Sequence, residues 1–215
     1  MTFKEKLDKF CEYESCDFFS DDDIELIGRL SYDMNSFIRA LSAETLARIQ
    51  SVNSKNILFR LANDKNCFVR TEAYDSLSVF CEKEVAEFLS KKIVVESDDL
   101  ARSYAITSFA QVCKATGVLS SEIEFLASVS EKMKSERCLL CMFYALYVFG
   151  KEEYLGKIYS FLHSNNYRII CTAVSLLGDI INYSNSKDII DEVKKVDNNS
   201  IAVQSRVRSF LDEYG

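Results

Sequence analysis

Hydrophobic and polar positions alternate along this chain with a helical period, and the alternation restarts at regular intervals. The clearest copy begins in a polar loop at Asp64 and continues into a run whose apolar residues recur every three to four positions as far as Leu77. When this copy is aligned with the rest of the chain, a reference residue falls at positions 39, 70, 102, 137, 170 and 204, at intervals of 31 to 35 residues. A fixed period of this length is typical of stacked helix pairs, so the pattern predicts an all-α solenoid.

The positions after each reference residue repeat as well. A small or aliphatic residue stands three positions after each reference residue. A large apolar residue stands seven positions after it. The first set is Ser42, Ala73, Ala105, Leu140, Ala173 and Val207, and the second is Leu46, Leu77, Phe109, Tyr144, Leu177 and Leu211. Both positions share one face of a helix, which we expect to be buried between repeats.

The pattern predicts one domain over residues 1–215, with an N-terminal cap at 1–32 and about six repeats at 33–215. The cap contains helices at 3–14 and 24–32. First helices are predicted at 35–50, 67–81, 99–115, 136–149, 167–182 and 199–213, and second helices at 53–62, 83–95, 120–133, 151–163 and 186–195. Asparagine, aspartate or serine precedes most first helices as an N-cap, at Asn66, Asp98 or Asp99, Ser135, Asn165 or Asn166, and Asn198 or Asn199. Gly117 and Gly150 stand where first helices end, as residues suited to a positive φ.

An acidic residue stands six places before every reference arginine. The pairs are Asp33 with Arg39, Asp64 with Arg70, Glu96 with Arg102 and Glu131 with Arg137, whereas Ser164 precedes Ile170 and Asn198 precedes Gln204. We interpret this correlation as a ladder of ion pairs that ties each loop to its own or the neighbouring helix start.

The segment 64–77 reads Asp-x-x-x-x-Val-Arg-x-x-Ala-x-x-x-Leu, which resembles the short form of the HEAT repeat, about thirty residues long. The resemblance extends over 33–215 and weakens in the last two copies, where Ile170 and Gln204 replace the arginine. It implies a right-handed α-α superhelix in which the second helices line the concave side. It says nothing about activity, because HEAT arrays support many functions.

The composition of the chain indicates in which cellular compartment the protein is found. The longest uncharged apolar stretch, 138–150, is too short for a bilayer, and the charged N-terminus has no continuous apolar segment of a secretory signal. We therefore expect a cytoplasmic protein whose eight cysteines are reduced thiols packed as small apolar residues.

The sequence offers little for catalysis. The single histidine, His163, has no nucleophile assigned to it by any motif, and Cys138-x-x-Cys141 lies inside a predicted helix without a second cysteine pair. Residues 21–23, three aspartates, lack the ligand spacing and the glycine of a calcium loop. We therefore expect no enzyme activity, no metal and no cofactor.

Charge argues against nucleic acid as the partner. The chain has 26 basic and 33 acidic residues, a net charge of -7 and a sequence pI near 4.9. Such a surface repels a phosphate backbone, and it attracts a basic protein instead.

Candidate partner-binding residues are the acids of the second helices, two tyrosines beside them, and the acidic segment 11–27. The candidates are Glu84, Glu87, Glu122, Glu124, Glu152, Glu153, Tyr154, Tyr159, Asp188, Asp191, Asp21, Asp22 and Asp23. For segment 11–27, two interpretations stay open: a solvated cap that favours the next helix start, or a patch that docks a basic partner.

The leading hypothesis is a monomeric, non-catalytic scaffold that binds a basic protein. Several bacterial immunity proteins look like short HEAT arrays, so the resemblance implies an immunity protein that occludes a basic, nuclease-like toxin domain. The alternatives are a general HEAT adaptor and a regulatory subunit of an enzyme complex.

Overall fold

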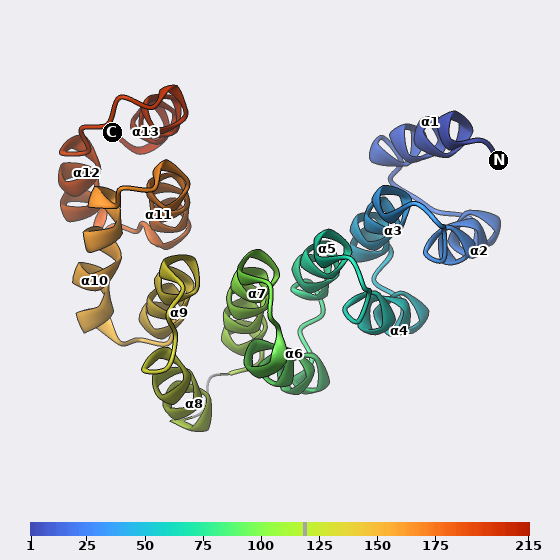
Figure 1. Cartoon of the computed structure of the whole chain (residues 1–215), viewed down its shortest axis with the longest axis horizontal. Helices are drawn as coiled ribbons and strands as arrows, with labels where there is room; N and C mark the ends of the chain where they lie inside the picture. The colour runs from blue at the N-terminus through green and yellow to red at the C-terminus, as the bar shows by residue number, and fades with distance from the viewer. Residues whose placement is uncertain (118–119) are drawn as a thin grey trace. The chain divides into compact units, whose positions relative to one another are not determined.

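The computed structural model describes residues 1–117 and 120–215, and these residues form helices and no strands (Figure 1). The predicted all-α class is confirmed. The chain divides into two compact units, the first Met1–Gly117 and the second described over residues 120–215. The single domain predicted over residues 1–215 stays a prediction.

Seven helices build the first unit in two layers. They are α1 (Phe3–Glu14), α2 (Asp21–Leu30), α3 (Ser36–Ile49), α4 (Val52–Leu61), α5 (Cys67–Leu77), α6 (Lys83–Val95) and α7 (Asp99–Thr116). In Figure 1, α1, α3, α5 and α7 form one layer, and α2, α4 and α6 form the other. Within the first layer, α3 packs against α5 and α5 packs against α7.

The described part of the second unit repeats this arrangement. Its elements are α8 (Ser120–Ser130), α9 (Glu136–Val148), η1 (Glu152–Tyr154), α10 (Leu155–Ser160), η2 (Phe161–His163), α11 (Tyr167–Ile180), α12 (Ser186–Lys194) and α13 (Ile201–Tyr214). Helices α9, α11 and α13 form one layer, in which α11 packs against both neighbours (Figure 1).

The predicted helices are present, with a few differences at their ends. Helix α2 starts three residues earlier than predicted because Ser20 and Asp23 form a capping box at its start. The predicted second helix 151–163 contains an α-helix only over Leu155–Ser160, between two 3₁₀ turns. No side-chain cap satisfies the start of this segment, which is consistent with its irregular first turn.

Side-chain caps fix the starts of four first helices as predicted. Asn66, Asp98, Ser135 and Asn166 each accept a hydrogen bond from a backbone amide in the first turn of the following helix. The prediction for the last repeat is wrong, because Ser200 is the N-cap of α13 and makes no side-chain cap bond.

Two reference arginines of the first unit, Arg39 and Arg70, bind the acid of the following repeat. Arg39 Nε and Nη2 donate to the two carboxylate oxygens of Asp64, both at 2.7 Å, and Arg70 makes the same two bonds to Glu96, both at 2.7 Å. Nη1 of each arginine donates to a backbone carbonyl in its own loop, Arg39 to Asp33 at 2.8 Å and Arg70 to Asp64 at 2.9 Å. Each arginine therefore holds its own loop through the backbone and the next loop through the side chain.

The neighbouring positions of the repeat follow the same rule. Asp33 has no earlier reference arginine, and Lys6 of the cap helix α1 takes that role, with Nζ 2.5 Å from Asp33 Oδ2. In the second unit, taken by itself, Ser164 stands at the position where an acid would have to receive Arg137. Among residues 120–215, Arg137 forms no ion pair and donates instead to Thr172 Oγ1 at 3.4 Å.

Glu96 is the most enclosed carboxylate of the ladder, with a side chain 3% exposed. Besides Arg70, it accepts from the Tyr74 hydroxyl at 3.0 Å and from the Asp98 amide at 3.0 Å. Burial by itself raises the pKa of Glu96, but these hydrogen bonds outweigh burial and lower the pKa to about 2. Ionised Glu96 therefore stabilises the fold above its ordinary value of 4.5, and this contribution is lost as the pH falls toward 2.

Small side chains allow the helices of the first layer to approach closely. Three and six residues after each reference arginine, α3 buries Ser42 and Thr45, α5 buries Ala73 and Ser76, and α7 buries Ala105 and Ser108. Close packing of this layer places it on the inner side of the curve that the first unit follows (Figure 1). The expectation that second helices line the concave side is therefore wrong for this unit, since α4 and α6 lie on its outer side.

Removing the ladder carboxylate should destabilise the fold strongly. Glu96→Gln leaves the half-buried Arg70 guanidinium beside a neutral side chain, and we expect the free energy of unfolding in urea to fall by about 3 kcal/mol. Glu25→Gln is the matched control, because Glu25 pairs with Arg29 at 3.6 Å and both side chains are about 70% exposed. The control should lose less than about 1 kcal/mol, and equal losses in the two variants would contradict the structural role of the ladder.

Two glycines of the second unit allow a backbone test. Gly150 has φ +86°, where a Cβ is strained, whereas Gly156 lies inside α10, where an added Cβ would meet no atom within 4 Å. Gly150→Ala should lower the free energy of unfolding by about 1 kcal/mol, and Gly156→Ala should leave it unchanged or raise it by about 0.5 kcal/mol. Thermal unfolding of both variants measures the difference, and the same sign for both would contradict this account.

Candidate interaction surface

The acids predicted on second helices have different surroundings in the first unit. On α6, Glu84 accepts from Lys55 Nζ at 2.9 Å, and Glu82 accepts from the same nitrogen at 2.5 Å. Glu87 on the same helix is exposed. Because Lys55 already neutralises part of the charge of Glu84, Glu87 is the predicted acid of α6 that a partner reaches most readily.

The remaining second-helix acids lie in the second unit. Glu122 is half-buried on α8 and accepts from Ser121 Oγ at 3.1 Å. The exposed ones are Glu124 on α8, Glu152 and Glu153 on η1, and Asp188 and Asp191 on α12. The predicted acids are thus spread over two units and do not converge on one site within either unit.

The three aspartates 21–23 form the first turn of α2. Asp21 and Asp22 are exposed, and their charge favours the helix N-terminus. Asp23 accepts from the Tyr13 hydroxyl at 2.9 Å and from Ser20 Oγ at 2.5 Å. The hydrogen bonds from Ser20 and Tyr13 lower the pKa of Asp23 to about 2. Asp23 therefore holds α1 against α2, and Asp21 and Asp22 remain accessible.

The two candidate tyrosines are packed against their own unit. The Tyr154 ring lies 5.4 Å from the Phe143 ring, with Lys157 Nζ 4.2 Å above it. The Tyr159 hydroxyl is enclosed and has no hydrogen-bond partner among the described residues. Burial, with the nearby charge of Asp188, raises the pKa of Tyr159 to about 12.

A group of carboxylates that the sequence did not single out lies on the first helices. This inner acidic cluster consists of Glu44 on α3 and Glu72 and Asp75 on α5. Burial, then the charges of Asp75 and Glu44, raise the pKa of Glu72 to about 7. Partial desolvation also raises the pKa of Asp75, although its side chain is exposed. No described cation pairs with these three carboxylates, so negative charge is concentrated here.

The residues considered for catalysis lie apart from one another. His163 is exposed at the end of η2, and Cys138 and Cys141 are buried in α9. Within residues 1–117 and 120–215, no group of three His, Cys, Asp or Glu side chains is arranged to hold a metal ion. In the same ranges, no helix is long and apolar enough to cross a membrane.

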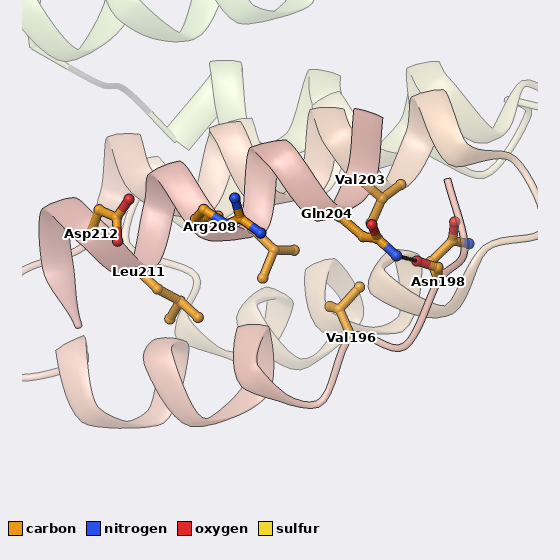
Figure 2. Close-up of a pocket in the computed structure, with 8 residues that line it drawn as sticks. Val196, Asn198, Val203, Gln204, Arg208, Leu211 and Asp212 are labelled. Atoms are coloured by element: carbon orange, nitrogen blue, oxygen red, sulfur yellow. Dashed lines mark hydrogen bonds between the residues drawn. The ribbon is translucent and has the colours of Figure 1, made fainter. Parts of the chain in front are cut away.

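Figure 2 shows a pocket of 370 Å³ along α13. Gln204 Nε2 donates to the Asn198 carbonyl at 3.4 Å at one end of it. The lining residues are Val196, Asn198, Val203, Gln204, Val207, Arg208, Leu211 and Asp212. This lining contains no histidine, cysteine or serine, so it lacks a nucleophile with an adjacent base.

The comparisons with known proteins agree with the repeat architecture. Residues 25–110 match the family model described as HEAT repeats. The matched part of the chain runs from α2 into α7, and the HEAT-like solenoid fold predicted from the sequence is confirmed. No curated protein matches the chain.

Two solved structures share the fold. The YibA protein of E. coli is 21% identical, with a TM-score of 0.59 over 94% of this chain and 74% of that one. The complex of CpcE and CpcF of phycocyanin lyase from Nostoc sp. PCC7120 is 15% identical, with a TM-score of 0.59 over 91% of this chain and 84% of that one. Likeness at these identities establishes a helical repeat scaffold and no shared activity.

Because of the inner acidic cluster, we expect the free energy of unfolding to fall as the pH rises. Because the pKa of Glu72 rises from its ordinary value of 4.5 to about 7 on folding, the protonated form stabilises the fold, and this contribution is lost as the pH rises from 4.5 through 7. Glu72→Gln should lack this decline and be more stable than the wild type at pH 8, by on the order of 1 kcal/mol after solvent screening. Urea unfolding of the wild type and the variant at pH 5 and pH 8 measures this difference in stability.

Glu87→Gln is the control for this experiment, since it removes the same charge from an exposed side chain on α6. The control should keep the wild-type difference between pH 5 and pH 8. If Glu72→Gln also keeps that difference, the raised pKa of Glu72 is contradicted.

Proposed function

We propose that this protein is a non-catalytic scaffold that binds a basic protein, and that it serves as a bacterial immunity protein occluding a nuclease-like toxin domain. The observation that carries the proposal is the distribution of negative charge. The net charge is -7, and exposed carboxylates occur on α2, on the outer helix α6 and on α8, η1 and α12 of the second unit. A basic partner is attracted electrostatically to such a surface at many points.

The absence of an assembled reaction centre supports a binding role for the described residues. The exposed His163 and the buried Cys138 and Cys141 occupy different elements. The pocket in Figure 2 holds one arginine and one aspartate as its charged groups. We therefore propose that the protein acts by covering a surface of its partner and not by chemistry on a substrate.

The mechanism of inhibition is steric and electrostatic. A nuclease binds the phosphates of its substrate with lysine and arginine side chains, and carboxylates on a rigid scaffold compete for the same groups. Opposite charges also speed association, an effect that weakens as salt screens the charges. Helices packed in a repeat array lose little entropy on binding, because the carboxylates are already positioned.

Capture by the tagged wild-type protein tests the proposal. The bait is offered to purified basic nuclease toxin domains in catalytically inactive form, at 50 mM and 500 mM NaCl, and the active toxins are assayed for DNA and RNA cleavage with increasing bait. We expect one-to-one capture of one domain, loss of its cleavage activity, and at least tenfold weaker binding at the higher salt.

Two results would contradict the proposal in different ways. Capture of a domain without loss of cleavage would exclude occlusion and favour a HEAT adaptor. Capture of a cellular enzyme complex from the native cytosol, with none of the toxin domains retained, would favour the regulatory-subunit alternative.

A further inference from the structure

Helices α3, α5 and α7 each leave one face uncovered, on the side of their layer opposite α4 and α6. Exposed or half-buried residues recur on each helix at intervals of four, three and four positions, whereas the positions between them are mostly buried. We call this set the open face: Phe37, Leu41, Glu44 and Arg48 on α3, Phe68, Glu72 and Asp75 on α5 with Val79 just beyond its end, and Leu100, Tyr104, Thr107 and Gln111 on α7.

A row of large apolar side chains crosses the open face. Phe37, Phe68 and Leu100 all stand two places before the reference arginine and are 44%, 45% and 41% exposed. Tyr104, one turn further along α7, is 36% exposed. Single exposed apolar residues are common on protein surfaces, but three at one register of consecutive repeats form a continuous row. The arginine ladder fixes that register, because Arg39 and Arg70 each tie one helix start to the next loop.

Apart from Arg48, the charged side chains of the open face are acidic. The inner acidic cluster, Glu44, Glu72 and Asp75, lies one to two turns along α3 and α5 from the apolar row. The face contains no lysine, and the guanidinium of its single arginine, Arg48, donates to the backbone carbonyls of Tyr13 and Cys16. Arg48 is thus directed toward the chain segment between α1 and α2.

We infer that the open face of α3, α5 and α7 docks a basic amphipathic helix of the partner, whose apolar residues pack on Phe37, Phe68 and Leu100 while its lysines or arginines face Glu44, Glu72 and Asp75. This inference rests on the proposed function and deepens it by naming the surface and the element that binds there. It differs from the sequence-based candidates, which place the contact on second helices.

The spacing of the row fits a helix that crosses the layer. Neighbouring packed helices lie about 8 to 10 Å apart, so the three apolar side chains of the row are separated by roughly that distance. On a helix that crosses the layer, residues seven positions apart are separated by about 10.5 Å. Apolar residues at every seventh position therefore meet the row, and basic residues on one flank of the same helix meet the acids.

A synthetic peptide tests the docking surface without knowledge of the partner. The probe is a fluorescein-labelled helical peptide of leucine, alanine and lysine, with leucines seven positions apart and lysines along one flank. A peptide with glutamate in place of lysine is its control. Fluorescence anisotropy at 50 mM and 500 mM NaCl should show that the basic peptide binds the wild type more weakly at high salt, and that the acidic peptide does not bind.

Paired variants locate the contact. Phe37→Ala with Phe68→Ala should weaken binding at least tenfold, and Glu72→Gln with Asp75→Asn should weaken it several-fold and reduce its salt dependence. The matched controls on the outer helix α6 are Val94→Ala with Val95→Ala, and Glu84→Gln with Glu87→Gln, and both should bind as the wild type does. Circular dichroism confirms that each variant is folded, since all substituted side chains are exposed or half-buried.

The outcomes separate this inference from the proposed function. Loss of peptide binding in the α6 variants with retention in the open-face variants overturns the inference and leaves inhibition of a basic toxin intact. Absence of peptide binding by the wild type at both salt concentrations overturns the inference as well. Binding at the open face together with failure to capture any toxin domain supports the docking surface and contradicts the immunity function.

Discussion

The bidentate bond between an arginine and the acid of the following repeat is the interaction on which the first unit depends. It joins a helix start to a neighbouring loop, while the third guanidinium nitrogen holds the loop of its own repeat. Taking these charges out of water is costly, and the bonds to both carboxylate oxygens offset that cost only when the helices are in register. The ladder is therefore a device that specifies register, and a misaligned repeat would leave a buried charge unpaired.

Register has a direct consequence for the surface. When α3, α5 and α7 are aligned by the ladder, equivalent positions of successive repeats lie next to each other. Side chains that would be scattered on a less regular fold become the apolar row at Phe37, Phe68 and Leu100. The same alignment brings Glu44 of α3 near Glu72 of α5, and their repulsion contributes to the raised pKa of Glu72. The apolar row and the inner acidic cluster of this unit thus have one origin.

The sequence-based choice of binding residues relied on the family's expected layer order, and the layer order differs in the first unit. Acids such as Glu87 were selected because they lie on second helices, which were expected to be concave. Small side chains at positions such as Ala73 and Ala105 permit the first helices to pack tightly, and the tightly packed layer takes the inner side. A signal for the open face was present in the sequence, since Phe37, Phe68 and Leu100 share one position of the repeat, but exposure of that position is not encoded in periodicity.

By itself, the sequence determined the helices, their order and most of their caps, because helical period and capping depend on residues within one or two turns. It also indicated the ladder residues Arg39, Asp64, Arg70 and Glu96, through the acid that accompanies each arginine, although Arg137 of the same pattern forms no ion pair among residues 120–215. Only the tertiary structure decided that the acid serves the preceding arginine, which layer lies inside, and that Glu72 is difficult to ionise. These properties depend on contacts between helices about thirty residues apart, and local patterns do not specify the distances or the curvature that produce them.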